Sequence, residues 1–382
     1  MKIRRLSNDI EIKKYIKALD VDRGGVAILA AKHRHYLVEI KDLHVGAANI
    51  LKQDALSVGA DLAVPKGTII AEKLKVDALL IASRRELEKL AAKEKLQPFG
   101  LKKLAVYLED LLRLQESKKT QIMGIINAND DSFYSGSRFK GSDAIKTLEQ
   151  MIEEGADIID VGAVSSRPGA AKVDEKEELE RIRPIADAIY EQKLNERVRL
   201  SIDSYAPEVI EYVLERGFHI VNDITGFEDE RVCKITARYG AAAVIMHMQG
   251  TPQTMQSDPT YENVVDEVYA YLQRQAEKAE SYGIKEIVLD VGIGFGKTLE
   301  HNIALLQHLP HFRSLKHPLL VGASRKSMID RISPSPVEKR LGGTLALHLY
   351  AARNGADILR VHDVYEHAQA LAVQRALEAP IL

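Results

Sequence analysis

The sequence predicts an α/β protein in which a closed (β/α)₈ barrel, or TIM barrel, is preceded by a small α+β domain. Eight short runs rich in Val, Ile and Leu are each followed by a longer charged stretch with helical periodicity. Such near-continuous apolar runs are typical of parallel strands that helices cover. The polar residues that end the runs are expected to meet at the carboxyl end of the barrel, where active sites of this fold lie. The runs are 122–127, 157–163, 198–204, 219–225, 242–248, 286–292, 318–324 and 356–362.

Chain length indicates two domains. Of the 382 residues, 262 lie in 121–382, close to the roughly 250 that such a barrel needs. Residues 1–118 are therefore expected to form a separate α+β domain of unknown role, with a linker near 116–120. In that domain the patterns predict strands at 25–30, 35–40 and 76–83, and helices at 45–59, 84–96 and 101–115.

Composition indicates a cytoplasmic protein. A single cysteine, Cys233, excludes an internal disulfide framework and suits a reducing compartment. The basic first residues have no apolar signal-peptide core behind them. No apolar run approaches the roughly 18 residues of a membrane span, so no membrane partner is expected.

Charge is distributed unevenly along the chain. Residues 1–120 carry 24 Lys and Arg against 16 Asp and Glu, whereas the remaining residues carry 29 against 39. The basic part could bind nucleic acid, dock electrostatically onto the acidic part, or present a solvated lysine-rich face. We favour the last two interpretations, because no basic stretch is interleaved with stacking aromatic residues. No nucleic-acid partner is expected.

Several strand ends carry side chains suited to binding. Asn127 after the first strand could ligate a hard cation through its amide oxygen or form an Asx turn. Arg167 after the second could grip an anion or lie on the surface before a turn. Asp203, Asn222 and Asp223 in the middle strands suit a guanidine-like edge, such as that of an aminopyrimidinone, although each alone is commonly a turn residue.

The segment DVGIGFGKT at 290–298 has glycines at alternate positions. Its spacing matches neither a dinucleotide fingerprint nor a phosphate loop, because the third glycine comes too early and Lys297 stands where a helix should begin. The glycines are expected to allow close approach of the backbone to a flat ligand.

The last two strand ends predict an anion site. Loops after strands seven and eight of these barrels frequently bind phosphate. Four basic groups and a hydroxyl gather there, namely Ser324, Arg325, Lys326, Arg360 and His362. One anionic substrate group explains all five more simply than five unrelated structural roles.

Eight motifs follow one another through the barrel: MGIINANDDSF, DVGAVSSRPGA, SIDSY, VNDITG, MHMQGTP, DVGIGFGK, VGASRKS and RVHDV. Together they resemble the dihydropteroate synthases of folate biosynthesis, over essentially all of 121–382. The resemblance implies a barrel, usually a homodimer, that joins 6-hydroxymethyl-7,8-dihydropterin pyrophosphate to p-aminobenzoate and releases pyrophosphate with the help of magnesium. Sulfonamides are then expected to compete with p-aminobenzoate.

The resemblance also implies roles for individual residues. The pterin would be held by Asp203, Asn222, Asp290 and Lys326 and lined by Met246 and Phe295. Pyrophosphate would be held by Asn127, Arg360 and His362, with Asn127 as magnesium ligand. The p-aminobenzoate pocket would be formed by Phe133, Ser166, Arg167, Pro168 and Ser327. The catalytic residues would be Lys326, Arg360, His362 and Asp131 of the first loop.

The implied transfer is dissociative, or SN1-like. Pyrophosphate leaves first because magnesium, Arg360 and His362 stabilise its charge. The electron-rich dihydropterin delocalises the positive methylene that remains, and the neutral arylamine attacks without a strong base.

Two loops and the N-terminal extension depart from the usual family pattern. Asn129 and Asp130 stand where the family has Thr-Pro, Val164 replaces an acid, and Ser166 replaces a threonine. Asp130 adds negative charge near an anionic leaving group. Some bacterial members of the family carry an N-terminal extension like residues 1–120.

Other functions remain open at this point. A catalytically silent pterin-binding paralogue would share the barrel, since a fold does not guarantee an activity. A pterin-dependent methyltransferase would share the pterin-holding Asp and Asn but would not need SSRPG or RVHDV. A phosphate-binding barrel isomerase would need an acid/base pair near Lys326, which the sequence does not offer.

Overall fold

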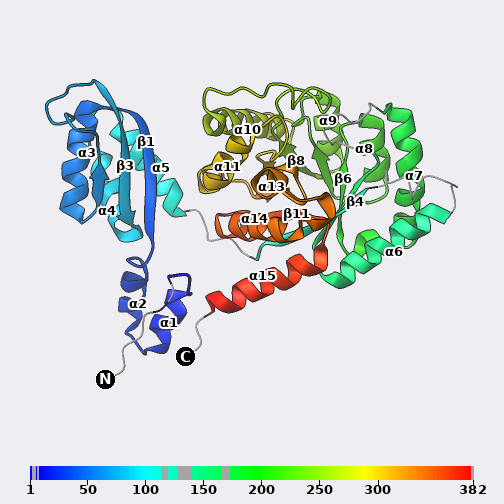
Figure 1. Ribbon diagram of the computed structural model, residues 1–382, viewed down its shortest axis with the longest axis horizontal. Helices are drawn as coiled ribbons and strands as arrows, with labels where there is room; N and C mark the ends of the chain where they lie inside the picture. The colour runs from blue at the N-terminus through cyan, green and yellow to red at the C-terminus, as the bar shows by residue number, and fades with distance from the viewer. Residues whose placement is uncertain (2–5, 7, 114–118, 128–138, 165–172, 380–382) are drawn as a thin grey trace. The chain divides into compact units, whose positions relative to one another are not determined.

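The structure is a computed structural model that describes residues 1, 6, 8–113, 119–127, 139–164 and 173–379 (Figure 1). The chain divides into two compact units, Met1–Gln115 with Val373–Leu382, and Glu116–Ala372. Among the residues described, no helix combines the length and the apolar character that a membrane crossing requires.

The larger unit is the closed barrel that the sequence predicts. In the described ranges, eight strands each run parallel to their neighbours, and β4 closes the barrel by pairing with β11. Strands that are adjacent in space are consecutive in sequence, as expected for repeated strand–helix units. The strands are β4 (Gln121–Asn127), β5 (Ile158–Gly162), β6 (Arg199–Asp203), β7 (Ile220–Asp223), β8 (Ala242–Met246), β9 (Ile287–Asp290), β10 (Leu319–Val321) and β11 (Ile358–Val361).

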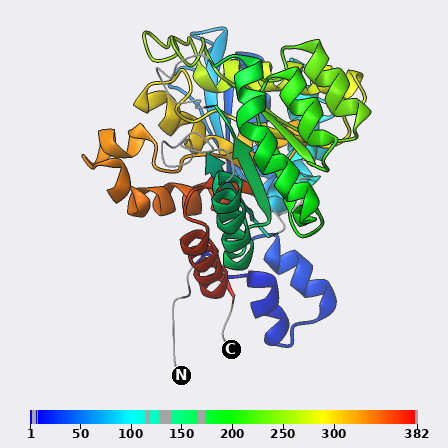
Figure 2. The ribbon, with the colours of Figure 1, turned by 90° about the vertical axis from the view of Figure 1, so that its right-hand side faces the viewer.

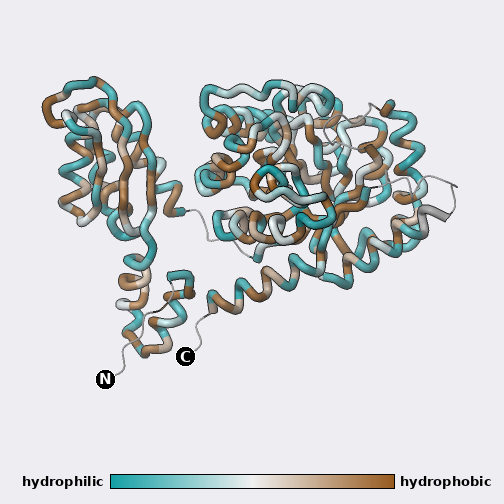
Figure 3. The backbone as a smooth tube through the Cα atoms, viewed as in Figure 1, coloured by the Kyte–Doolittle hydropathy of each residue, from teal (hydrophilic) through white to brown (hydrophobic). Residues whose placement is uncertain are grey.

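Helices surround this barrel (Figures 1 and 2). Their starts follow from the local sequence, since Asp174 and Asp229 cap α7 and α9 by accepting backbone hydrogen bonds and Pro207 opens α8. Figure 3 shows hydrophobic and hydrophilic residues alternating along the helices, as expected when one face is buried. The helices are α6 (Phe139–Glu154), α7 (Glu175–Glu191), α8 (Pro207–Leu214), α9 (Glu230–Arg238), α10 (Val264–Ser281), α11 (Leu299–Gln307), α12 (Leu309–Phe312), α13 (Ser327–Ile332), α14 (Leu341–Arg353) and α15 (Val364–Glu378).

Each barrel strand alternates between an inner and an outer layer of apolar side chains. In β8, Ala242 and Val244 belong to the inner cluster, whereas Ala243 and Ile245 belong to the outer one. This alternation is that of any strand. Because it fixes the phase of the strand, it also decides which residues at the strand end point into the barrel mouth. The inner cluster is Met123, Ile158, Ile220, Ala242, Val244, Val288, Leu320 and Ile358.

The smaller unit contains an antiparallel sheet which, over the described residues, has the order β1-β3-β2. Its strands are β1 (His35–His44), β2 (Asp61–Ala63) and β3 (Lys75–Ser83). Helices α3 (Val45–Val58), α4 (Arg84–Glu94) and α5 (Leu101–Arg113) share an apolar core with this sheet. The strands predicted at 35–40 and 76–83 and the three helices predicted in this unit are confirmed.

The strand predicted at 25–30 is wrong. This segment belongs to helix α2 (Arg23–Ala30), which follows α1 (Ile12–Ala18). Asp22 caps α2 by accepting a hydrogen bond from the amide of Gly24. The apolar run is too short to distinguish a helical from a strand period, so the cap upstream of it is the more informative signal.

Candidate active site

The polar ends of the barrel strands lie at inward positions. Asn222 follows Ile220, and Asp290 follows Val288, each by the two residues that return a strand to the same face. Asp223 has the outward phase, and its carboxylate accepts hydrogen bonds from the backbone amides of the next turn. Asp223 is therefore a turn residue rather than a ligand-binding one. The inward set is Asn127, Asp160, Asp203, Asn222, Met246, Asp290, Arg360 and His362.

Arg360 joins side chains from four strands. Its Nε donates to Oδ2 of Asp160 and its Nη2 donates to Oδ2 of Asp203, each at 2.6 Å. The same Oδ2 of Asp160 accepts a hydrogen bond from Nδ2 of Asn222 at 3.0 Å. A guanidinium, two carboxylates and an amide thus form one network across the barrel mouth, with Arg360 making strong charge-assisted bonds.

Burial shifts the charge states in the mouth. Asp203 and Asp290 are 9% and 7% exposed, and burial raises the pKa of both carboxyls above their usual range. Arg360 opposes this shift at Asp203, and Lys326 opposes it at Asp290. Burial lowers the pKa of Lys326 to about 8. Acidic and basic groups with shifted pKa values in one enclosed space are characteristic of active sites.

Lys326 extends over the glycine-rich loop after β9. Its Nζ lies 4.3 Å from the centre of the Phe295 ring and donates to the carbonyl of Ile293. A Cβ on Gly294 would lie 3.0 Å from Cδ of Lys326, so a larger residue there would displace the lysine. Lys326, Phe295 and Gly294 therefore form one wall of the mouth.

The loops after β10 and β11 are joined by side-chain contacts. Oγ of Ser324 lies 2.8 Å from Nδ1 of His362. Arg325 forms an ion pair with Asp363, in which its Nε donates to Oδ2 at 3.1 Å. Arg325, which the sequence analysis places at the predicted anion site, is thus paired with a carboxylate in this structure.

A second buried cation, Lys297, joins the loops after β8 and β9. Its Nζ lies 3.0 Å from Nδ1 of His247 and donates to the carbonyls of His247 and Phe295 at 3.2 and 2.9 Å. Because an ammonium group only donates, Nδ1 accepts and the imidazole is neutral. Burial, assisted by the charge of Lys297, lowers the pKa of His247 to about 3, and burial lowers the pKa of Lys297 to about 7.

The glycines of 290–298 permit this contact between loops. A Cβ on Gly292 would collide with the carbonyl oxygen of His247, and one on Gly296 would collide with that of Gln249. Both glycines also have positive φ, at +70° and +63°. The close backbone approach expected from the sequence is present, but it is made to the neighbouring loop.

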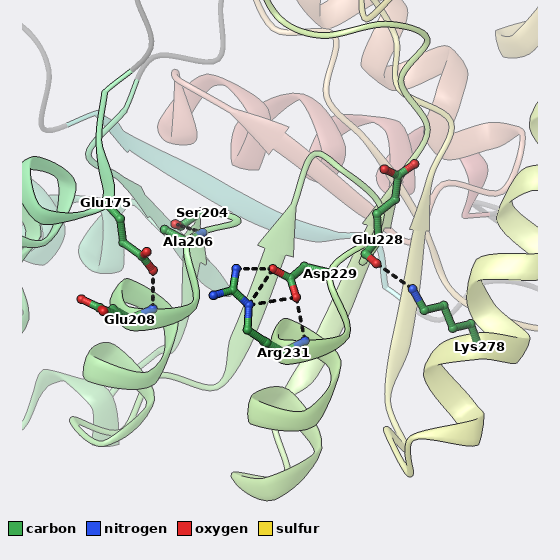
Figure 4. Close-up of polar contacts among 8 residues, drawn as sticks. All are labelled: Glu175, Ser204, Ala206, Glu208, Glu228, Asp229, Arg231 and Lys278. Carbon is green, nitrogen blue, oxygen red and sulfur yellow. Dashed lines mark hydrogen bonds and ion pairs between the residues drawn. The ribbon is translucent and has the colours of Figure 1, made fainter.

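Short-range contacts restrain the loop after β6 (Figure 4). Oγ of Ser204 accepts from the amide of Ala206 at 3.1 Å. The amide of Glu208, in the first turn of α8, donates to Oε1 of Glu175 at 2.6 Å. The backbone that immediately follows Asp203 is therefore anchored at two points.

The loop after β7 is restrained in the same way (Figure 4). Lys278 of α10 donates to the carbonyl of Glu228 at 2.8 Å. Asp229 accepts from the amide of Arg231 at 2.8 Å and pairs with its guanidinium. These contacts fix the segment beyond Asn222, so both middle strands present their polar ends from a rigid backbone.

Comparisons with known proteins identify the family. The family model described as "Pterin binding enzyme" matches residues 123–362. This chain belongs to that family. A bifunctional dihydropteroate synthase/dihydropteroate reductase of Helicobacter pylori is 40% identical over 378 residues, which cover 99% of this chain and 99% of that protein. A dihydropteroate synthase of Escherichia coli is 43% identical over 258 residues, which cover 67% of this chain and 90% of that protein.

Solved structures of pterin-binding enzymes agree with this assignment. Dihydropteroate synthase of Yersinia pestis, in complex with a sulfonamide drug, is 38% identical with a TM-score of 0.63, and the match covers 68% of this chain and 94% of that one. Dihydropteroate synthase of Thermus thermophilus, in complex with 4-aminobenzoate, is 42% identical with a TM-score of 0.62. The match covers 68% of this chain and 95% of that one.

As a pterin-binding enzyme of this kind, the chain is a transferase of folate biosynthesis. It is a dihydropteroate synthase: it condenses 6-hydroxymethyl-7,8-dihydropterin pyrophosphate with p-aminobenzoate to give 7,8-dihydropteroate and pyrophosphate. Its substrates are therefore small molecules. The relatives favour this activity over the methyltransferase and silent-paralogue alternatives.

Most of the site residues that the sequence predicts are at the barrel mouth. Asn127 is the last residue of β4, and Met246, the last of β8, is the register partner of Asp290. Ser327 is exposed and begins α13 directly after Lys326. Five of the predicted residues lie outside the described part of the chain, namely Asp131, Phe133, Ser166, Arg167 and Pro168.

The sequence analysis gave no specific role to two buried groups, Asp160 and Lys297. Asp160 binds both Arg360 and Asn222, and Lys297 holds the loop of His247. The inward phase of β5 could have identified Asp160, since it follows Ile158 by two residues. Nothing in the sequence around Lys297 distinguishes a buried lysine from a surface one.

Magnesium is compatible with the side chains at the mouth. Among the residues described, no three His, Cys, Asp or Glu side chains gather in a way that could hold a metal ion. Asn127 offers a hard amide oxygen at the end of β4, the strand that pairs with β11. Because Mg²⁺ commonly takes phosphate oxygens and water rather than an all-protein cage, one such oxygen at the barrel mouth fits the ion.

Proposed function

We propose that the pterin ring is held by inward groups of β6, β7 and β9 and by the loop after β10. The residues are Asp203, Asn222, Asp290 and Lys326, with Met246 and Phe295 lining the slot. A carboxylate accepts two parallel N–H donors, which is what the aminopyrimidinone edge of a pterin offers. The observations that carry this proposal are that Asp203 and Asn222 belong to the network around Arg360, and that the charges of Asp290 and Lys326 act on each other.

Pyrophosphate, in this proposal, is bound by Asn127, Arg360 and His362, which lie on the neighbouring strands β4 and β11 and the loop that follows β11. Magnesium, when bound through Asn127, supplies positive charge that stabilises the leaving pyrophosphate. Arg360 pairs with Asp203 in this structure, so a pterin donor at Asp203 competes with its Nη2. That competition turns Nη2 toward the anion while Nε stays on Asp160.

The proposed transfer is dissociative. The bond between the methylene carbon and pyrophosphate breaks first, and its electron pair leaves with pyrophosphate, whose charge Arg360 and His362 stabilise. The amine nitrogen of p-aminobenzoate then forms the new bond with its lone pair and loses a proton to solvent. The barrel needs no strong base for this step, because the arylamine is neutral at pH 7.

For p-aminobenzoate, we propose a pocket built from the two loops after β4 and β5 together with Ser327. The loop residues are Phe133, Ser166, Arg167 and Pro168, with Asp131 acting in catalysis, and all five lie outside the described ranges. Complexes of relatives with a sulfonamide drug and with 4-aminobenzoate support a shared pocket for the two compounds. Sulfonamides should therefore raise the apparent KM for p-aminobenzoate without lowering kcat.

These roles are tested by pyrophosphate release from purified protein with magnesium and both organic substrates. Lys326→Ala should lower kcat/KM for the pterin substrate by at least about a hundredfold. Lys285→Ala provides the matched control, because Lys285 is an exposed lysine just before β9 at the amino end of the barrel. An equal effect of the two substitutions would contradict the role of Lys326.

A homodimer is a further proposal, which rests on the family resemblance. One chain has a mass of 42.5 kDa. Light scattering on the purified full chain should give twice that mass. A monomeric mass at micromolar concentration would contradict it.

The smaller unit suggests a second activity. The Helicobacter pylori relative that matches the chain almost end to end is named for both dihydropteroate synthase and dihydropteroate reductase. The Escherichia coli synthase, which covers 67% of this chain, carries the first name alone. We therefore propose that this chain also reduces 7,8-dihydropteroate and that residues 1–118 are required. The reduction adds a hydride to C6 and a proton to N5 and needs a hydride donor such as a reduced nicotinamide nucleotide.

The second activity is tested by oxidation of reduced nicotinamide in the presence of dihydropteroate. The full chain should catalyse it, and a chain lacking residues 1–118 should lose this activity while retaining condensation. Reduction by the shortened chain, or none by the full chain with either nicotinamide nucleotide, would contradict the proposal.

A further inference from the structure

Two backbone amides of the loop after β10 are bound by one face of helix α14. The amide of Ala323 donates to Nε2 of His348 at 3.0 Å, and the amide of Arg325 donates to Oγ1 of Thr344 at 2.9 Å. Thr344 and His348 are one helical turn apart, and both are fully buried. These amides flank Ser324 and precede Lys326, so α14 controls the path of the segment that carries the proposed pterin and anion ligands.

Hydrogen bonding determines the tautomer of His348 and of a second buried histidine, His367 on α15. Because Nε2 of His348 accepts from Ala323, its Nδ1 carries the proton and donates to Nε2 of His367 at 2.9 Å. Nδ1 of His367 then carries a proton and donates to the carbonyl of Asp363 at 2.6 Å. Each ring is neutral, and each donor has one acceptor. Burial lowers the pKa of both imidazoles, which agrees with this arrangement.

This relay of two histidines begins at the loop after β10 and ends at the loop after β11. Two other contacts join the same loops, the hydrogen bond between Ser324 and His362 and the ion pair between Arg325 and Asp363. The two rings of the relay are buried, since His348 is 0% exposed and His367 is 1% exposed. The relay therefore fixes the separation of the backbones from which Lys326 and His362 extend.

We propose that His348 and His367 are positioning residues for the pterin pyrophosphate substrate, acting through Lys326, which is proposed to hold the pterin, and His362, which is proposed to hold the pyrophosphate. The inference rests on the proposed roles of those two residues. Neither relay histidine touches substrate. Their effect is geometric, because loss of the relay lets the two loops separate, so that His362 no longer holds pyrophosphate at the correct distance from the pterin held by Lys326.

The test compares His348→Leu with the conservative His348→Gln. Leucine removes both hydrogen bonds, whereas glutamine offers an acceptor toward Ala323 and a donor toward His367. Pyrophosphate affinity, measured by calorimetry with magnesium, should fall roughly tenfold in His348→Leu and recover to within about threefold in His348→Gln. The KM for p-aminobenzoate should change less than about twofold, because four of the five residues proposed for its pocket lie on the loops after β4 and β5 and only Ser327 follows Lys326.

His219→Leu is the matched control. His219 also accepts a backbone hydrogen bond, from the amide of Leu200 at 3.1 Å, but it precedes β7 at the opposite end of the barrel. Its loss should leave pyrophosphate affinity unchanged. If His348→Leu lowers the melting temperature yet binds pyrophosphate like the unmodified protein, the relay is structural only and the inference is overturned.

A spectroscopic measurement covers the case in which His348→Leu does not fold. Nitrogen NMR of the unmodified protein should show both His348 and His367 uncharged, with the single ring proton on Nδ1, at neutral pH with or without pyrophosphate. A positively charged ring with both nitrogens protonated, or a single proton on Nε2 at either residue, would overturn the relay. If the unmodified protein binds no pyrophosphate, the proposed site and the relay both fail; bound pyrophosphate with unchanged affinity in His348→Leu overturns the relay alone.

Discussion

Asp160 connects a side chain that we propose for the pterin with one that we propose for pyrophosphate. Its side chain is fully buried, and its Oδ2 accepts hydrogen bonds from both Arg360 and Asn222. Burying a charged carboxylate is unfavourable without a counter-ion. The buried charge of Asp160 and that of Arg360 therefore stabilise each other. One carboxylate oxygen thus orients the group proposed for the anion and the group proposed for the pterin.

Replacing Asp160 with Asn should reduce catalysis with little change in fold. The substitution keeps the size of the side chain and removes its charge, so Arg360 shifts toward Asp203 and away from the anion. We expect kcat/KM for the pterin pyrophosphate to fall about 10- to 100-fold, with KM for p-aminobenzoate nearly unchanged. Asp187→Asn, which breaks an ion pair with Arg216 on the outer helices, is the control. Equal losses in the two variants would show that Asp160 has no special role.

For single residues, the sequence predicted which polar side chains lie at the site better than it predicted their hydrogen-bond partners. Asp203, Asn222 and Arg360 were predicted as site residues, and all three are in one network. The bonds of Arg360 could not be predicted, because they join residues as far as 200 positions apart and depend on how the barrel closes. The ion pair of Arg325 could not be predicted for the same reason, since its partner Asp363 lies 38 residues away.

The glycine-rich loop after β9 shows how one element can depend on another. Gly292 and Gly296 have no room for a side chain, because the backbone of 247–249 lies against them. Lys297 adds hydrogen bonds between the same two loops. The wall that carries Phe295 therefore owes its position to the loop after β8.

Gly296→Ala should disrupt this contact, and Gly240→Ala is its matched control. Both glycines have nearly the same φ, +63° and +64°, but a Cβ on Gly240 meets nothing within 4 Å. Each alanine costs about 1 kcal/mol for the left-handed backbone. Only Gly296→Ala adds a collision with the carbonyl of Gln249, for roughly 1–3 kcal/mol more. Urea unfolding of the two variants measures the difference, and similar stabilities would contradict the interlocked loops.

Long, repeated elements were predictable from the sequence, whereas short ones were not. The eight barrel strands are near-continuous apolar runs, which only a sheet buried on both faces requires. Residues 25–30, a glycine and five apolar residues, show neither a helical nor a strand period, and a helix cap decides their structure. Strand β2, with three residues, gave no signal at all. The alternation inside each strand was available in the sequence and would have placed Asp160 inward and Asp223 outward.

The two units of the molecule have separate apolar cores, so their stabilities can respond differently to pH. The core of the smaller unit contains a fully buried carboxyl, Glu94, at the end of α4. Burial, reinforced by the charge of Asp54, raises the pKa of Glu94 to about 7. The unfolded chain releases this proton near its ordinary pKa of about 4.5, so folding retains a proton that the unfolded state has lost.

Stability of the smaller unit should therefore fall as pH rises from about 4.5 to about 7, and then level off. Glu94→Gln removes the titrating group and should stabilise this unit at pH 8 by roughly 2 kcal/mol, with no gain at pH 4. Hydrogen exchange of α3 and α4 in the full chain measures this without unfolding the barrel. Glu88→Gln, at an exposed position of the same helix, is the control. A gain at pH 4 equal to that at pH 8 would contradict the buried proton.

The network of Arg360 also bears on how the chain is made. Arg360 comes 200 residues after Asp160 and 157 after Asp203, on the strand that completes the barrel. During translation both carboxylates are synthesised long before Arg360, which is their partner in the folded barrel. A partial barrel without Arg360 therefore cannot bury them favourably. A chain that ends before Arg360 should therefore leave the barrel incompletely folded and accessible to proteases. Closure of the barrel by β11 therefore coincides with the assembly of the charge network that we propose binds the substrate.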